Sequence, residues 1–284
     1  HHETAGVGDD YGEAFYLKNY HFESVDLSHR ISPGMSINHN FTYIGIQREE
    51  QVYWGEPSAF TIKNKQMQYY VNPVFVAGKK WYVSASGNLI WGDYSYYAGA
   101  INRDKYFYNG TVYFRDLVLT ASTWFFTGNF APGVEVDYGN FNNSGFSQYS
   151  AWVTWYPLSN LNLYFTPRVY FKNDSENGLG FNTIGISGGA QLGPVHMFGQ
   201  YLRGEMVNFI EPAGYVASNF PGRSEQKIMG SIYFPVGKKY QLVMRYISQD
   251  IIEKYQVYTN ATARSSMEYK YLKHTLTAGI SWNF

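Results

Sequence analysis

The chain contains no cysteine in its 284 residues, which removes a disulfide framework, a thiolate nucleophile and any Cys-ligated metal. It also has no apolar run approaching the roughly 20 residues of a helical membrane span, and its mean hydropathy is −0.34. The N-terminus shows no charged, apolar and small-residue succession typical of a signal peptide. We therefore expect a mature or N-terminally incomplete chain without transmembrane helices.

Charge is scarce and balanced. The 22 basic and 22 acidic residues cancel, and charged residues make up only 15% of the chain, which is low for a soluble domain. A chain without net positive charge is a poor binder of nucleic acid, so we expect no such partner. Aromatic residues, in contrast, reach 19%, with 28 Tyr and as many Gly.

The last residues of the chain alternate between apolar and polar or small side chains. The apolar positions are Leu276, Ala278, Ile280, Trp282 and Phe284. A period of two predicts a β-strand with one apolar face. The same period recurs in Leu161–Lys172, Thr183–Leu192, Lys227–Phe234 and Tyr240–Ile247. These stretches are close to the length of about ten residues that a tilted strand needs to cross a bilayer.

Two kinds of connection alternate along the chain. Short turns rich in Pro, Gly and Asn are expected at Ser32–Gly34, Ala77–Lys80, Ala131–Gly133, Pro157–Asn160, Leu192–Pro194 and Pro235–Lys238. Longer polar stretches lie between them, at Arg48–Phe60, Gly92–Thr111, Asn140–Gly145, Asn173–Gly180, Glu205–Glu225 and Asp250–Met267. Short turns on one rim and long loops on the other are typical of outer-membrane barrels.

This pattern predicts an all-β, transmembrane, antiparallel up-and-down β-barrel. Thirteen strands can be traced, the first near His21–Ile31, and an even number requires a fourteenth, either in Tyr11–Asn19 or upstream of residue 1. Twelve strands would require two to merge between Asp104 and Asn140. We expect residues 1–19 to form an N-terminal segment or first strand and residues 20–284 to form the barrel.

The final strand resembles the closing strand of bacterial outer-membrane β-barrel proteins, and no particular family within that class. The resemblance implies that Gly279, Ile280, Trp282 and Phe284 form a C-terminal assembly signal. It further implies a location in the bacterial outer membrane, contact with membrane lipid, and barrel-assembly machinery as a partner during insertion. Abundant Tyr, Asn and Lys suggests a Bacteroidota-like source.

Charged residues on the expected inward register are the candidates for lumen lining. They are Arg30, Arg115, Arg168, Arg245, Lys172, Lys227, Glu135 and Asp137. These residues either select solutes in an open pore or satisfy one another inside a plugged barrel. Bulky inward candidates favour a narrow lumen, namely Tyr82, Trp152, Tyr156, Tyr164, Tyr170, Phe198 and Tyr233.

Other aromatic residues fall on the outward register near strand ends, where they suit the lipid headgroup layer. They are Trp81, Phe125, Trp155, Phe165, Phe234, Tyr240, Tyr246 and Trp282. Two apolar runs in the expected long loops, Tyr94–Ala100 and Val207–Tyr215, either fold inward to cap the barrel or dock a partner.

No motif points to catalysis, and we expect no enzyme activity and no cofactor. The His residues lack metal-ligand spacing, although His21, His29 and His39 lie on neighbouring expected strands. A rim hydrolase would need a Ser or acid beside a His, and the neighbours Ser28 and His29 point to opposite faces. We therefore expect a narrow or plugged barrel that passes a solute across the outer membrane. The alternative is an accessory barrel with a protein partner in that membrane.

Overall fold

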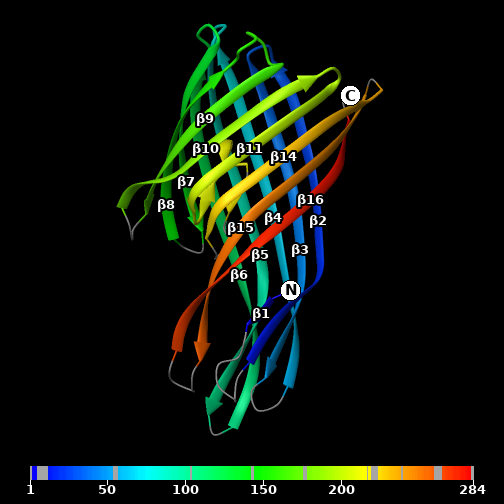
Figure 1. The fold of residues 1–284 in the computed structure, drawn as a ribbon, viewed down its shortest axis with the longest axis vertical. Coiled ribbons are helices and arrows are strands. Elements are labelled where there is room, and N and C mark those ends of the chain that lie inside the picture. The colour runs from blue at the N-terminus through cyan, green and yellow to red at the C-terminus, as the bar shows by residue number, and fades with distance from the viewer. Residues whose placement is uncertain are drawn as a thin grey trace.

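The chain folds into one antiparallel β-sheet that coils into an up-and-down barrel (Figure 1). The structure is a computed structural model and describes residues 2–4, 12–53, 57–102, 104–141, 144–174, 178–215, 217–218, 223–237, 239–258 and 264–282. Consecutive strands pair in chain order in a fourteen-stranded sheet, with β12 and β13 forming a separate two-stranded sheet. The predicted fold class and strand number are therefore confirmed.

The strands are β1 (His2–Thr4), β2 (Gly12–Ser32), β3 (Met35–Tyr53), β4 (Pro57–Ala77), β5 (Trp81–Asn102), β6 (Asp104–Phe125), β7 (Phe130–Phe141), β8 (Ser144–Trp155), β9 (Leu163–Asp174), β10 (Gly178–Leu192), β11 (Val195–Met206), β12 (Phe209–Ile210), β13 (Ala217–Ser218), β14 (Ser224–Val236), β15 (Tyr240–Tyr258) and β16 (Arg264–Trp282). A single 3-10 turn, η1 (Pro212–Gly214), lies between β12 and β13. None of the described residues forms a helix long and apolar enough to cross a membrane.

The two faces of the sheet differ in polarity in the way that the alternation predicts. On β7, Val134 and Val136 are exposed, whereas Glu135 and Asp137 between them are buried. Across the described residues the buried side chains are more often polar than apolar, and large apolar side chains are mostly on the exposed outer face. This is the reverse of a soluble globular protein, in which apolar side chains fill the interior.

Strand length divides the barrel into a tall and a short wall. The strands β2 to β6 and β15 to β16 have between 19 and 22 residues. The strands β7 to β11 and β14 have between 12 and 15. In Figure 1 the tall hairpins project beyond the short wall at the end opposite the short turns.

Three of the predicted long loops are mostly strand. Arg48–Phe60, Gly92–Thr111 and Asp250–Met267 continue the ladders β3–β4, β5–β6 and β15–β16, for example with Tyr96 opposite Gly110. The sequence did not predict these strands because their many polar residues break the apolar alternation. The backbone hydrogen bonds of a ladder do not require an apolar face.

The short turns lie where the sequence predicts them, with one correction. Ala131–Gly133 is part of β7, and the turn lies at Thr127–Asn129, where Gly128 has φ of +57°. Gly133 is required by packing instead, since a Cβ at this position would meet the Trp152 ring at 2.3 Å.

The N-terminal part of the sheet differs in detail from the predicted boundaries. β2 begins at Gly12 and so takes in most of Tyr11–Asn19, while the three residues of β1 pair with the other edge of β2. β6 and β7 are separate strands, so the twelve-strand alternative is wrong. Within the described part of the chain, no ladder joins β16 to β2.

Candidate functional site in the barrel lumen

Residues 207–215, the internal loop, leave the sheet after β11 and fold into the lumen before the chain returns to β14. The loop contains β12 and η1, and Phe209, Ile210, Glu211 and Gly214 are buried in it. One of the two alternatives for the apolar run Val207–Tyr215 is thereby realised, since it packs inside the barrel. The other run, Tyr94–Ala100, lies within β5.

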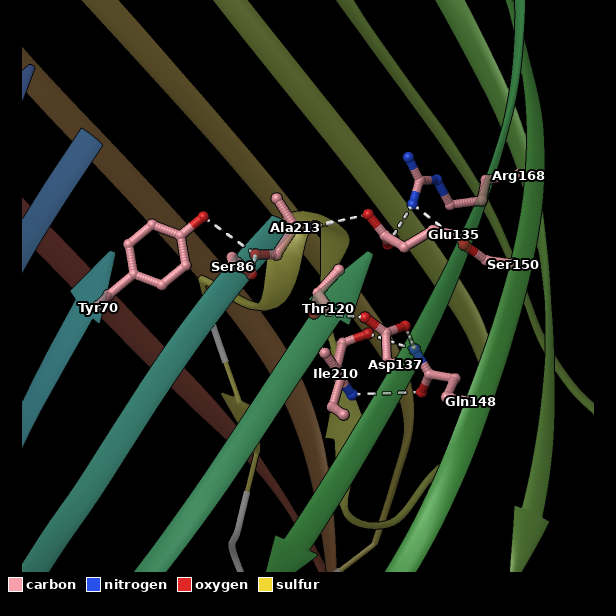
Figure 2. A network of polar contacts seen from close by, with 10 residues as sticks. All are labelled: Tyr70, Ser86, Thr120, Glu135, Asp137, Gln148, Ser150, Arg168, Ile210 and Ala213. Carbon is pink, nitrogen blue, oxygen red and sulfur yellow. Dashed lines mark hydrogen bonds and ion pairs between the residues drawn. The ribbon is translucent and has the colours of Figure 1, made fainter. Parts of the chain in front are cut away.

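Gln148 on β8 holds the backbone of Ile210 at both of its polar groups. The Gln148 Nε2 donates to the Ile210 carbonyl oxygen at 2.6 Å, and the Ile210 N–H donates to Gln148 Oε1 at 3.2 Å (Figure 2). The Ile210 side chain packs in a buried apolar cluster with Ile90, Val118, Phe141 and Phe146.

A second anchor lies three residues later, at Ala213. Its N–H donates to Glu135 Oε2 at 2.9 Å. Its carbonyl oxygen accepts from the Tyr70 hydroxyl at 3.0 Å and from the Ser86 hydroxyl at 2.5 Å (Figure 2). The Asn88 Nδ2 donates to the next two carbonyls, those of Gly214 and Tyr215, each at 3.2 Å.

Gly214 is the residue type that this anchor requires. Its φ is +69°, a conformation that side chains disfavour, and a Cβ at this position would lie 2.5 Å from Thr120 Oγ1. Ala213 has φ of +62° and Asn208 +47°, so the loop keeps two further left-handed residues that are not glycine. Such conformations persist only where surrounding contacts hold them.

One ion pair and one hydrogen bond from a lysine attach the loop to the short wall. Lys227 on β14 pairs with Glu211, and both side chains are buried. Lys172 on β9 donates to the Val207 carbonyl oxygen at 3.0 Å. Phe209 meets the Tyr170 ring at a centroid distance of 4.9 Å, within a cluster that also contains Leu202 and Met206.

The wall beneath the loop has its own polar contacts. The Arg168 guanidinium donates to Glu135 Oε1 at 2.8 Å and lies 3.9 Å from the centre of the Trp152 ring. Asp137 is fully buried and accepts from the Thr120 hydroxyl at 2.6 Å and more weakly from Gln148 at 3.4 Å (Figure 2). Each carboxylate is therefore held by donors of the lumen wall.

Tyr215 closes the loop against the opposite wall. Its hydroxyl donates to Asp26 Oδ1 on β2 at 2.8 Å, and its ring contacts Tyr70 at a centroid distance of 5.1 Å. Burial and then the neighbouring Asp26 carboxylate raise the pKa of the Tyr215 hydroxyl above its ordinary value, because both disfavour the phenolate. The hydroxyl is therefore a neutral donor at physiological pH.

The structure places seven of the eight predicted lumen residues on the inward register. Glu135, Asp137, Arg168, Lys172 and Lys227 gather around the internal loop. Arg245 contacts Ser231, and Arg30 donates to the carbonyl oxygens of Ser32 and Pro33 at the short turn.

Arg115 does not point into the lumen as predicted. It is exposed on the outward register beside exposed Tyr113 and Leu117, and Asp116 takes the buried inward position. The misassignment arises because the inward face of β6 carries Val118, which packs against the loop, so apolar residues occur on both faces.

A layer of aromatic rings narrows the lumen near the short turns. Tyr82 stacks on Trp124 at 5.2 Å between centroids, Phe126 contacts Tyr156 at 5.7 Å, and Tyr156 contacts Tyr164 at 6.1 Å. Three of these, Tyr82, Tyr156 and Tyr164, belong to the bulky residues predicted to face inward. The rings and the internal loop thus occupy successive levels of the same lumen.

Sequence reasoning missed several residues that hold the loop. They are Tyr70, Ser86, Asn88 and Gln148. A signal was present, because Ser84, Ser86 and Asn88 occupy alternate positions of one strand and form a polar inward register. Their partner, the loop backbone, could not be read from any pattern.

The polar groups of the lumen are arranged for recognition of the loop backbone. Among the residues weighed for a rim hydrolase, Ser28 donates to Asn38 at 2.7 Å, and His29 stacks on His39 with 5.3 Å between ring centroids. Within the described ranges, no three His, Asp or Glu side chains gather as metal ligands would. The polar groups of the lumen instead pair with peptide groups and with one another.

No family model and no curated protein matches the sequence. Among solved structures, the chain aligns with the outer membrane transporter YddB from Escherichia coli at a TM-score of 0.37 and 10% identity. The alignment covers 96% of this chain and 52% of that one, so this chain spans about half the length of that structure. A fourteen-stranded up-and-down sheet with an apolar outer face and a polar lumen fits the architecture of an outer-membrane β-barrel.

Proposed function

We propose that this protein is an outer-membrane channel whose lumen is occluded by its own internal loop and that passes a small solute when the loop moves. The observation that carries the proposal is the loop itself, whose backbone is hydrogen-bonded by side chains from β4, β5, β7 and β8. A loop that crosses the lumen and is held by side chains sets both the width and the chemistry of a pore.

A membrane position is supported by the outer face. Ile184, Ile186, Ile228 and Ile232, on the adjacent parts of the sheet, are each between 45% and 49% exposed. Exposed aromatic residues lie at the short-turn ends of strands, where Trp81 meets Phe125 at 5.9 Å and Trp155 meets Phe165 at 6.1 Å between centroids. We assign this arrangement to an aromatic girdle at the periplasmic headgroup layer.

Planar-bilayer recording of the purified protein tests the proposal. The wild-type barrel should show a small or intermittent current, because the loop and the aromatic rings leave a narrow passage. Replacement of residues 208–214 by a Gly-Ser segment of equal length should give a larger and steadier current. A loop-replaced barrel that is folded, as shown by its heat-modifiable mobility on gels, and still silent would overturn the channel function.

A second candidate is an accessory barrel that binds a protein partner through its tall wall. It is favoured by Tyr94, Tyr96 and Tyr113, which are exposed on the β5–β6 hairpin beyond the first ten or so residues that the bilayer needs. Mild-detergent purification from the native membrane should then yield a stoichiometric partner that is lost when Tyr113 is changed to Ser. Isolation of the barrel alone would count against this candidate.

A further inference from the structure

The lumen wall recognises the internal loop mainly through peptide groups. At Ile210 a single side-chain amide, that of Gln148, accepts from the N–H and donates to the carbonyl of the same residue. At Ala213 a carboxylate accepts from the N–H, while two hydroxyls donate to the carbonyl. Each of these two residues therefore has a donor and an acceptor matched to both of its backbone groups.

The wall also contacts the side chains of the loop at Phe209, Ile210 and Glu211. The Ile210 side chain enters the apolar cluster of Ile90, Val118, Phe141 and Phe146. Phe209 packs in the second apolar cluster, which contains Tyr170, Leu202 and Met206. The Glu211 carboxylate pairs with the buried Lys227 ammonium. The wall thus meets the loop sequence Phe-Ile-Glu with two apolar clusters followed by one cation, in that order.

The fit to a peptide is specific in its polarity. Both the N–H and the carbonyl oxygen are matched at Ile210 and again at Ala213, three residues later. One donor and one acceptor at each residue is what a polypeptide backbone presents. The cradle at Gly214 adds a size limit, since a Cβ there would lie 2.5 Å from Thr120 Oγ1 and 3.0 Å from Ser86 Oγ.

We propose that the lumen of this barrel is a peptide-binding site, that its internal loop occupies the site in place of a ligand, and that the solute is a short peptide with two apolar residues followed by an acidic one. The proposal rests on the channel function proposed above and names its substrate class. The loop acts as a tethered competitor, so a peptide that binds the same groups displaces it and opens the lumen.

A synthetic peptide provides the direct probe. The nonapeptide of residues 207–215, acetylated, amidated and dye-labelled, is titrated by fluorescence anisotropy into the detergent-solubilised loop-replaced barrel. The same titration uses a scrambled peptide and a peptide with Gln at the position of Glu211. We expect saturable binding of the native peptide, at least about tenfold weaker binding of the Gln peptide, and no saturation with the scrambled one. Wild-type protein should bind at least about tenfold more weakly than the loop-replaced barrel, because its own loop competes.

A matched pair of lumen substitutions places the peptide at the predicted site. Gln148→Ala in the loop-replaced barrel should weaken peptide binding about tenfold or more. Gln200→Ala should leave it unchanged, because Gln200 lies on the lumen side of β11 and makes no described hydrogen bond to the loop. If the loop replacement fails to fold, the full-length variant Phe209→Ser/Ile210→Ser, which removes both apolar anchors, takes its place.

The outcomes separate the two proposals. Equal binding of native and scrambled peptides, or equal effects of the two Gln substitutions, would overturn the peptide site. Peptide binding by a loop-replaced barrel that carries no current would overturn the channel function and leave the peptide site standing. Current through that barrel without saturable binding of the native peptide would overturn the peptide site and leave the channel function standing.

Discussion

Gln148→Ala should open the lumen by releasing Ile210, and the size of the effect follows from the hydrogen bonds. The substitution leaves the Ile210 N–H and carbonyl without their partners at 3.2 and 2.6 Å. A buried polar group without a partner costs about 1–3 kcal/mol. Water entering the lumen can hydrate part of the exposed backbone, so we take about 2–3 kcal/mol for the two groups together.

At 1.4 kcal/mol per factor of ten, this destabilisation of the docked loop corresponds to a roughly 25- to 150-fold increase in the ratio of open to closed time. The ratio is measured from single-channel recordings of wild-type and variant proteins in the same bilayer. Gln200→Ala is the control, because it makes the same change on the lumen register away from the loop, and it should stay within about threefold of wild type.

Two results would refute this reasoning. One is a Gln148→Ala channel with wild-type open and closed times although the barrel is folded. The other is an equal increase in the Gln200→Ala protein, which would show that any polar truncation in the lumen loosens the barrel and that the contact to Ile210 has no special role.

Three further changes test other parts of the structure. Gly214→Ala should destabilise the docked loop by about 2 kcal/mol or more and raise the current, because it adds a clash with Thr120 to a left-handed conformation. Gly193→Ala is the control: its φ is +58° and the space around it is open, so it should strain only its turn and leave the current unchanged. Ile232→Arg on the outer face should lower the unfolding free energy in lipid by about 2–4 kcal/mol in urea titrations, whereas Leu158→Arg in a short turn should have little effect. Because the pKa of Tyr215 is raised above its ordinary 10.0, the neutral hydroxyl stabilises docking fully below pH 10 and loses this role only as the pH rises through the higher value. Tyr215→Phe should therefore raise the open fraction in recordings at pH 7, because it removes the hydrogen bond that the hydroxyl donates to Asp26.

The sequence was sufficient for the fold because lipid-facing strands leave a strict period of two. Ile184, Ile186, Ile228 and Ile232 lie on the face that the alternation predicts. The alternation assigned Arg115 to the wrong face of β6. Apolar residues occur on both faces of this strand, because inward residues such as Val118 pack on the loop. The prediction also failed for the tall hairpins, where the apolar alternation fades while the ladders continue.

The site could be predicted only in part. Glu135, Asp137, Arg168, Lys172 and Lys227 were found because charged residues on an inward register are conspicuous. Gln148 was not, because its importance comes from Ile210, which is 62 residues away along the chain. That contact depends on how the loop folds back into the barrel, and local periodicity carries no information on it.

A covalent lock on the internal loop tests its role in closing the lumen most directly. The chain has no cysteine, so Glu211→Cys and Lys227→Cys introduce the only thiols, at the two ends of a buried ion pair. Bridging them with a short bifunctional methanethiosulfonate reagent should abolish the current of this variant in planar bilayers, and reduction should restore it above the wild-type level. A current that is unchanged by bridging and by reduction would contradict an occluding loop.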